Sequence, residues 1–60
     1  MEYIVENTET QKFLKVNGQF SSGIAFLKIF ESEADAADYI EDHFPIAADL
    51  KVVKYEGFAP

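Results

Sequence analysis

Short apolar segments alternate with polar stretches in the first third of the chain, and this pattern predicts strands. Strand-forming side chains fill residues 3–6 and resume at 12–16, and the stretch 7–11 between them is polar. Two segments of similar length joined by a short loop favour an antiparallel hairpin. Asn17-Gly18 then predicts a second reversal with a type I′ turn, because both residue types tolerate a positive φ.

The most apolar stretch of the sequence is Ile24–Phe30, which Lys28 interrupts. A short apolar run bounded by turn residues is typical of a strand that is buried on both faces. We therefore expect 24–30 to form a central strand flanked on both sides. A bulge or break at Gly23 is favoured, and Gln19-Phe20 either pairs straight back on Val16 or belongs to a longer loop.

Helical periodicity begins after Ser32. The Ser32 hydroxyl is a candidate N-cap, and the acid three residues later suits a capping-box variant. The helix is expected to end near Phe44, because Pro45 disfavours α geometry in the residue before it. At 100° per residue the helix is amphipathic. Its apolar arc consists of Ala36, Ala37, Ile40 and Phe44, and its acidic arc of Asp35, Asp38, Glu41 and Asp42.

The elements together predict an α+β fold. We expect a small single-layer sheet of three to four strands, in the order β-β-β-α-β, with one amphipathic helix packed on one face. The last strand is expected at 50–55 and a flexible tail at 57–60. Sixty residues make a single domain, 1–60, because so short a chain cannot divide its buried surface between two cores.

Composition limits how this domain is stabilised and what it binds. There is no cysteine, so apolar packing or oligomerisation must provide the stability, and 48% of the residues are apolar. No segment approaches the length of a membrane helix, and a cytoplasmic location is the default expectation. The net charge of −6 repels phosphate backbones and anionic headgroups, which argues against direct binding of nucleic acid or membranes.

The sequence offers no catalytic, metal or cofactor site. The one imidazole, His43, falls in the last helical turn, where we expect a structural or exposed role. No metal-ligand spacing is present, and no glycine precedes a helix as in a phosphate-binding loop. We therefore predict a protein that is not an enzyme and that works by binding.

Charge placement suggests the first binding hypothesis. Residues 31–49 contain seven acids and no lysine or arginine, whereas all five lysines fall on predicted strands. Carboxylates at i, i+3 and i+4 on a helix stand about 5–6 Å apart, comparable to neighbouring phosphates. The acidic arc could therefore imitate a phosphate backbone and inhibit or modulate a basic, nucleic-acid-binding protein, or it could serve solubility alone. In size and acidity the chain resembles the small proteins that viruses of bacteria use against host machinery.

The second hypothesis concerns the sheet. One helix cannot cover both faces of a sheet this apolar, so aromatic residues are expected on an uncovered face. Such a face favours a structural or accessory homodimer. The candidate interface residues are Tyr3, Phe13, Phe20, Tyr55 and Phe58.

Overall fold

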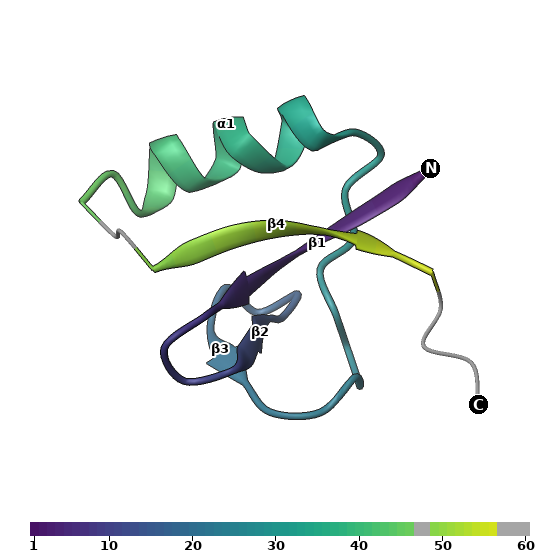
Figure 1. Cartoon of the computed structure of the whole chain (residues 1–60), viewed down its shortest axis with the longest axis vertical. Helices are drawn as coiled ribbons and strands as arrows, with labels where there is room; N and C mark the ends of the chain where they lie inside the picture. The colour runs from purple at the N-terminus through teal and green to yellow at the C-terminus, as the bar shows by residue number, and fades with distance from the viewer. Residues whose placement is uncertain (47–48, 57–60) are drawn as a thin grey trace.

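The computed structural model of the chain describes residues 1–46 and 49–56. Over these residues it contains a four-stranded antiparallel sheet and one helix, which confirms the α+β fold and the β-β-β-α-β order. The strands lie side by side as β3-β2-β1-β4, and the helix runs along one face of the sheet (Figure 1). The elements are β1 (Glu2–Asn7), β2 (Lys12–Leu14), β3 (Phe20–Ser21), α1 (Glu33–His43) and β4 (Leu50–Tyr55).

The hairpin predicted for the first two strands is confirmed. Asn7 pairs with Lys12 across the antiparallel β1–β2 ladder. The Asn7 side-chain oxygen accepts the amides of Glu9 at 2.9 Å and Thr10 at 3.2 Å, which fixes the start of the loop. The Gln11 amide donates to the Asn7 carbonyl at 2.7 Å, and Gln11 takes a φ of 60° to rejoin the sheet.

The second reversal occurs where it was predicted, but its turn type was wrong. Gly18 has a φ of 84°, whereas Asn17 lies outside the positive-φ region that a type I′ turn requires of both residues. The Gly18 amide donates to the Lys15 carbonyl at 2.9 Å, and the Lys15 amide donates to Gln19 at 2.8 Å. This is the three-residue hairpin in which glycine forms a bulge. The Asn17 side chain instead accepts the Gln19 amide at 3.0 Å.

The prediction of a central strand at 24–30 was wrong. The structure has a loop there that touches the sheet through two isolated bridges among the described residues, Lys15–Leu27 and Tyr3–Phe30. A continuous strand is interrupted because Phe26 has a φ of 60°. The segment therefore fills the space where β1 and β2 diverge, and the third strand is the short β3 at the sheet edge.

The predicted limits of the helix are confirmed. The Ser32 hydroxyl accepts the Asp35 amide at 3.1 Å, and the helix ends at His43 with Phe44 as its C-cap, just before proline. One prediction about its apolar arc was wrong: Ala37 is exposed. Tyr39 takes that place on the inner face, because the sheet lies toward the Ala36 side of the helix.

The principal core lies between α1 and the sheet. Alternation along each strand directs one set of apolar side chains toward the helix and the other set away from it. Ile4, paired with Val53, is fully buried on the face away from the helix. The cluster on the helix side contains the buried residues Val5, Leu14, Phe30 and Ala36 and the half-buried Tyr3, Phe20, Tyr39, Ile40, Phe44, Leu50 and Val52.

Candidate functional site

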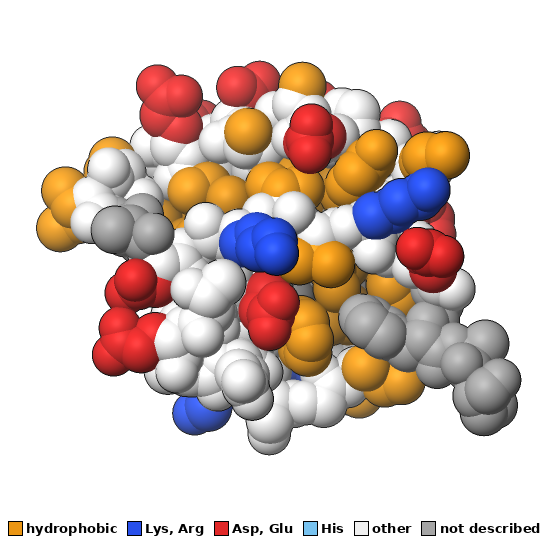
Figure 2. Space-filling view, viewed as in Figure 1, with side chains coloured by type: hydrophobic (Ala, Val, Ile, Leu, Met, Phe, Trp, Pro, Cys, Tyr) orange, Lys and Arg blue, Asp and Glu red, His pale blue; other side chains and the backbone are white. Residues whose placement is uncertain are grey.

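The acidic arc of α1 lies on the outer surface of the helix. We call its four residues, Asp35, Asp38, Glu41 and Asp42, the acidic face; all four are exposed. In Figure 2 acidic side chains lie along the upper edge of the molecule, over α1. From one turn to the next these residues are three or four positions apart, so their carboxylates lie above one another on one side of the helix. A basic molecule that approached this side would meet carboxylates from successive turns.

Aromatic packing fixes the helix in position beneath the acidic face. The Tyr39 ring lies 5.4 Å from the Phe30 ring, between centroids, and the Phe44 ring lies 5.5 Å from that of Phe20. Edge-to-face and tilted contacts at these distances stabilise a packed core. Ala36, which is fully buried, brings the helix backbone close to the sheet. The carboxylates are therefore presented by an element that is held along its length.

The ammonium groups of Lys28 and Lys15 contact groups other than the carboxylates of the acidic face. The Lys28 ammonium lies 5.0 Å from the centroid of the Tyr39 ring and 5.4 Å from that of Phe30, a cation–π arrangement. The Lys15 ammonium donates to the backbone carbonyls of Gly23 and Ala25. Lys28 and Lys15 also correct the expectation that every lysine lies on a strand, since both stand outside the assigned strands. Lys51 and Lys54 do lie on a strand, β4, and basic side chains are visible along β4 in the middle of Figure 2.

The five aromatic residues of the homodimer hypothesis do not form one surface. Tyr3 and Phe20 pack against the core on the helix side, so they belong to the covered face. Phe13 and Tyr55 alternate away from the helix and are half-buried. Phe58 lies outside the described residues. The proposed interface therefore loses the continuity that the hypothesis required of it.

Ser32 and His43, the hydroxyl and the imidazole of α1 and its cap, have structural partners. Ser32 caps α1, and the His43 ring stacks on Tyr39 with 4.0 Å between ring centroids. The His43 Nδ1 atom lies 3.1 Å from the Tyr39 carbonyl oxygen. Within residues 1–46 and 49–56, no three histidine or acidic side chains converge as metal ligands. In the same ranges no helix has the length and apolarity needed to cross a membrane.

Hydrogen bonds from Thr8 join the β1–β2 loop to the chain entering β4, and two carboxyls meet at this junction. Thr8 donates to the Asp49 carbonyl through its amide at 2.8 Å and its hydroxyl at 3.0 Å. This brings Glu9 next to Asp49. The pKa of the Glu9 carboxyl is raised, first by a hydrogen bond with the Asp49 side chain and then by repulsion from its charge.

Lys15 was not identified as a site residue from the sequence. It is buried, and it lines a hollow of about 310 Å³ between β3 and the loop that follows it. The sequence holds one signal that points here: residues 10–30 contain three lysines and no acid. That stretch is basic within an acidic protein.

Comparison with protein-family models, with curated proteins and with solved structures finds no match for this chain.

Proposed function

We propose that the protein acts in the cytoplasm by binding a basic, nucleic-acid-binding protein through the acidic face. The observation that carries this proposal is the exposure of all four carboxylates on a helix whose opposite side is packed on the sheet. A helix held in this way presents charge at low entropic cost on binding, because few groups need to be ordered. The chain would then inhibit or modulate its partner by occupying the groove that takes a phosphate backbone.

Charge separation within the molecule supports this mode of binding. Seven acids and no lysine or arginine fall between residues 31 and 49. The resulting field would steer a basic partner toward α1 and speed association at low ionic strength. It would equally repel nucleic acid, so the protein would compete with nucleic acid for the partner without binding it.

A charge-matched pair of variants tests the proposal. The helix variant is Asp38→Asn, Glu41→Gln and Asp42→Asn; it spares Asp35, whose carboxylate lies in the first turn and favours the helix dipole. The control variant removes three acids elsewhere. It is Glu2→Gln, Glu6→Gln and Glu56→Gln, residues of β1 and of the position after β4. Each variant changes the net charge by the same amount, so a difference between them reports position.

The measurement is capture of lysate proteins on the immobilised chain at low and high salt. We expect the wild type and the control variant to capture a basic protein at low salt, and the helix variant to lose it. Addition of a duplex oligonucleotide should release the captured protein, since both ligands would occupy one groove. Capture by the helix variant at wild-type levels, or binding that is indifferent to salt, would contradict the proposal.

A further inference from the structure

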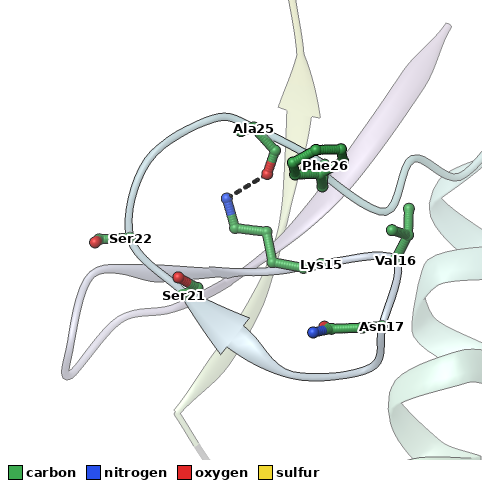
Figure 3. A pocket seen from close by; sticks show the side chains of 7 residues that line it. All are labelled: Lys15, Val16, Asn17, Ser21, Ser22, Ala25 and Phe26. Atoms are coloured by element: carbon green, nitrogen blue, oxygen red, sulfur yellow. Dashed lines mark hydrogen bonds between the residues drawn. The ribbon is translucent and has the colours of Figure 1, made fainter.

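Among the described residues, Lys15 is the charged residue that is buried, with 6% of its surface exposed. Its ammonium donates to the carbonyls of Gly23 and Ala25, each at 2.7 Å. Figure 3 shows the loop after β3 curving around the ammonium, with the bond to Ala25 dashed. Both acceptors are neutral, so neither cancels the positive charge.

The ammonium retains capacity for an anion. A lysine ammonium has three N–H donors, and the two carbonyls use two of them. A buried charge is costly unless it is paired, so a negative group beside Lys15 would be stabilised. The lining of the hollow favours this, because the described residues that form it include Lys15 and no acid. Lys15 is the charged residue in this lining, so a ligand in the hollow would face a positive group although the net charge of the chain is −6.

The hollow beside Lys15 has a polar side and an apolar side. Its volume is about 310 Å³, enough for a small organic molecule or one amino-acid residue. In Figure 3 the Ser21 and Ser22 side chains lie on one side of Lys15, and the Phe26 ring lies on the other. The polar lining is Lys15, Asn17, Ser21 and Ser22, and the apolar lining is Val16, Ala25 and Phe26.

The backbone at Phe26 gives a second reason to regard this hollow as a site. Phe26 has a φ of 60°, which is unfavourable for a bulky residue, and its side chain is 80% exposed. Its carbonyl is fixed by the Val16 amide at 2.9 Å. Strained residues that persist in folded proteins concentrate at ligand-binding positions. Here the strain holds an aromatic ring at the edge of the hollow.

We propose that the hollow binds a carboxylate that carries a flat apolar group. The carboxylate would accept hydrogen bonds from the Lys15 ammonium and from the Ser21 and Ser22 hydroxyls, and the apolar group would lie against Val16 and Phe26. A phosphate is a poorer fit, since three of the seven lining residues are apolar and one cation is present among them. The group could belong to a free aromatic acid or to the C-terminal residue of a peptide. The site shares no residue with the acidic face and is independent of the function proposed above.

Amide chemical shifts in a ¹H–¹⁵N NMR titration test the proposal. The probe is 3-phenylpropanoate, and its neutral control is 3-phenylpropanamide. We expect saturable shifts at Val16 and from Gly23 to Phe26, with a Kd on the order of 1 mM for so small a ligand. The amide should give much smaller shifts. Equal shifts with both compounds, or shifts spread over every lysine, would overturn the proposal.

Substitutions of two lysines test whether the Lys15 ammonium binds the carboxylate of the probe. Lys15→Met should weaken binding at least about tenfold, as expected for loss of a charge-assisted hydrogen bond. Lys54→Met, on β4, makes the same change of net charge and should bind like the wild type. Because Lys15→Met could also release the loop, Ser22→Asp provides a second test: its own carboxylate should occupy the Lys15 ammonium and block the probe. Wild-type affinity in Ser22→Asp, or in a folded Lys15→Met, would overturn the proposal.

Two peptides then distinguish the sources of the carboxylate. N-acetyl-Gly-Phe carries a free C-terminal carboxylate next to a phenyl ring, and its C-terminal amide is the control. If the acid peptide binds more tightly than 3-phenylpropanoate, the ligand is a chain end. If it binds more weakly, the ligand is a free aromatic acid. If the amidated peptide binds as well as the acid, carboxylate recognition is excluded.

Discussion

Phe26 combines features that residues in stable surface loops avoid. Its φ of 60° places Cβ against the following carbonyl, which costs roughly 1–2 kcal/mol in a residue other than glycine. Burial does not compensate for this cost, because the side chain is 80% exposed. The conformation is maintained by hydrogen bonds of its neighbours, including the bond from Lys15 to the adjacent Ala25 carbonyl.

The strain at Phe26 predicts a reversal of the usual order of alanine and glycine. Phe26→Gly should be more stable than Phe26→Ala by about 1 kcal/mol, although glycine normally loses more entropy on folding. Both variants remove the ring, so the difference between them isolates the backbone. Urea unfolding of the two proteins gives the comparison. An alanine variant that is equally or more stable would show that the left-handed conformation is absent in solution.

The Glu9–Asp49 pair predicts a pH-dependent gain from one substitution. Because the pKa of Glu9 is raised in the folded protein, its contribution to stability is full below the ordinary glutamate pKa and is lost as the pH rises. Glu9→Gln removes the repulsion while keeping a donor for Asp49. We expect this variant to unfold at a higher temperature than the wild type near pH 7, as measured by circular dichroism, and to show no such gain near about pH 3.

Salt provides the control for this effect. Glu9 is on the surface, so about 1 M salt should largely abolish the gain of Glu9→Gln. Glu56→Gln, which removes an exposed acid elsewhere, should not reproduce the pH dependence. A gain of Glu9→Gln that was the same at both pH values would mean that the two carboxyls are not close.

At the scale of elements, the rotation of α1 about its axis is shown by which of two adjacent alanines contacts the sheet. Ala36 is fully buried and Ala37 is exposed, although the two are neighbours in the chain. A small residue at the buried position lets the helix axis approach the strands closely. Tyr39 contacts Phe30 from this side of the helix, and the acidic face is exposed.

Enlarging each alanine in turn tests the orientation of the helix. Ala36→Leu should lower the free energy of unfolding by about 1–3 kcal/mol, because a well-packed core does not accept the added atoms. Ala37→Leu adds the same atoms on the solvent side and should change stability by less than about 0.5 kcal/mol. Chemical denaturation measures both. Similar losses in the two variants would mean that the helix is rotated from the described position.

At the scale of the whole molecule, acids are concentrated on α1, which carries no lysine or arginine, whereas the strands carry both acids and lysines. Figure 2 shows acidic groups over α1, and basic groups along β4 with further acidic groups beside them. The helix carries mutually repelling carboxylates at i, i+3 and i+4, which destabilise it by about 0.2–0.5 kcal/mol per pair. The proposed binding surface therefore has a cost in stability, as is common where charge is concentrated for recognition.

The helix variant Asp38→Asn, Glu41→Gln and Asp42→Asn should consequently be more stable than the wild type. We expect a gain of about 0.5–1 kcal/mol in low salt that disappears near 1 M. The control variant should gain less, because Glu6 lies opposite Lys51 in the β1–β4 register and its removal loses an attraction. Thermal unfolding at the two salt concentrations measures both changes. A larger gain in the control variant would place the repulsive field elsewhere.

Several features of this protein follow from the sequence alone, because each depends on residues that are close in the chain. The Ser32 cap and the stop before Pro45 set the helix limits. The loop after Asn7 and the glycine at position 18 set the two reversals. Hydrogen bonds that span two to four residues act in almost any tertiary context, so these signals predicted the α+β order correctly.

The tertiary structure decided where the apolar surplus goes. Residues 24–30 have the composition of a buried strand, yet Phe26 projects into solvent and its φ of 60° interrupts regular pairing. The Lys15 ammonium donates to the Gly23 and Ala25 carbonyls of the same loop. The same holds for the aromatic residues: which face Tyr3 occupies depends on its register with β4, far away in the sequence. Composition sets the amount of apolar surface. Contacts between residues distant in the sequence determine which part of that surface is buried. The hollow at Lys15 also depends on such contacts.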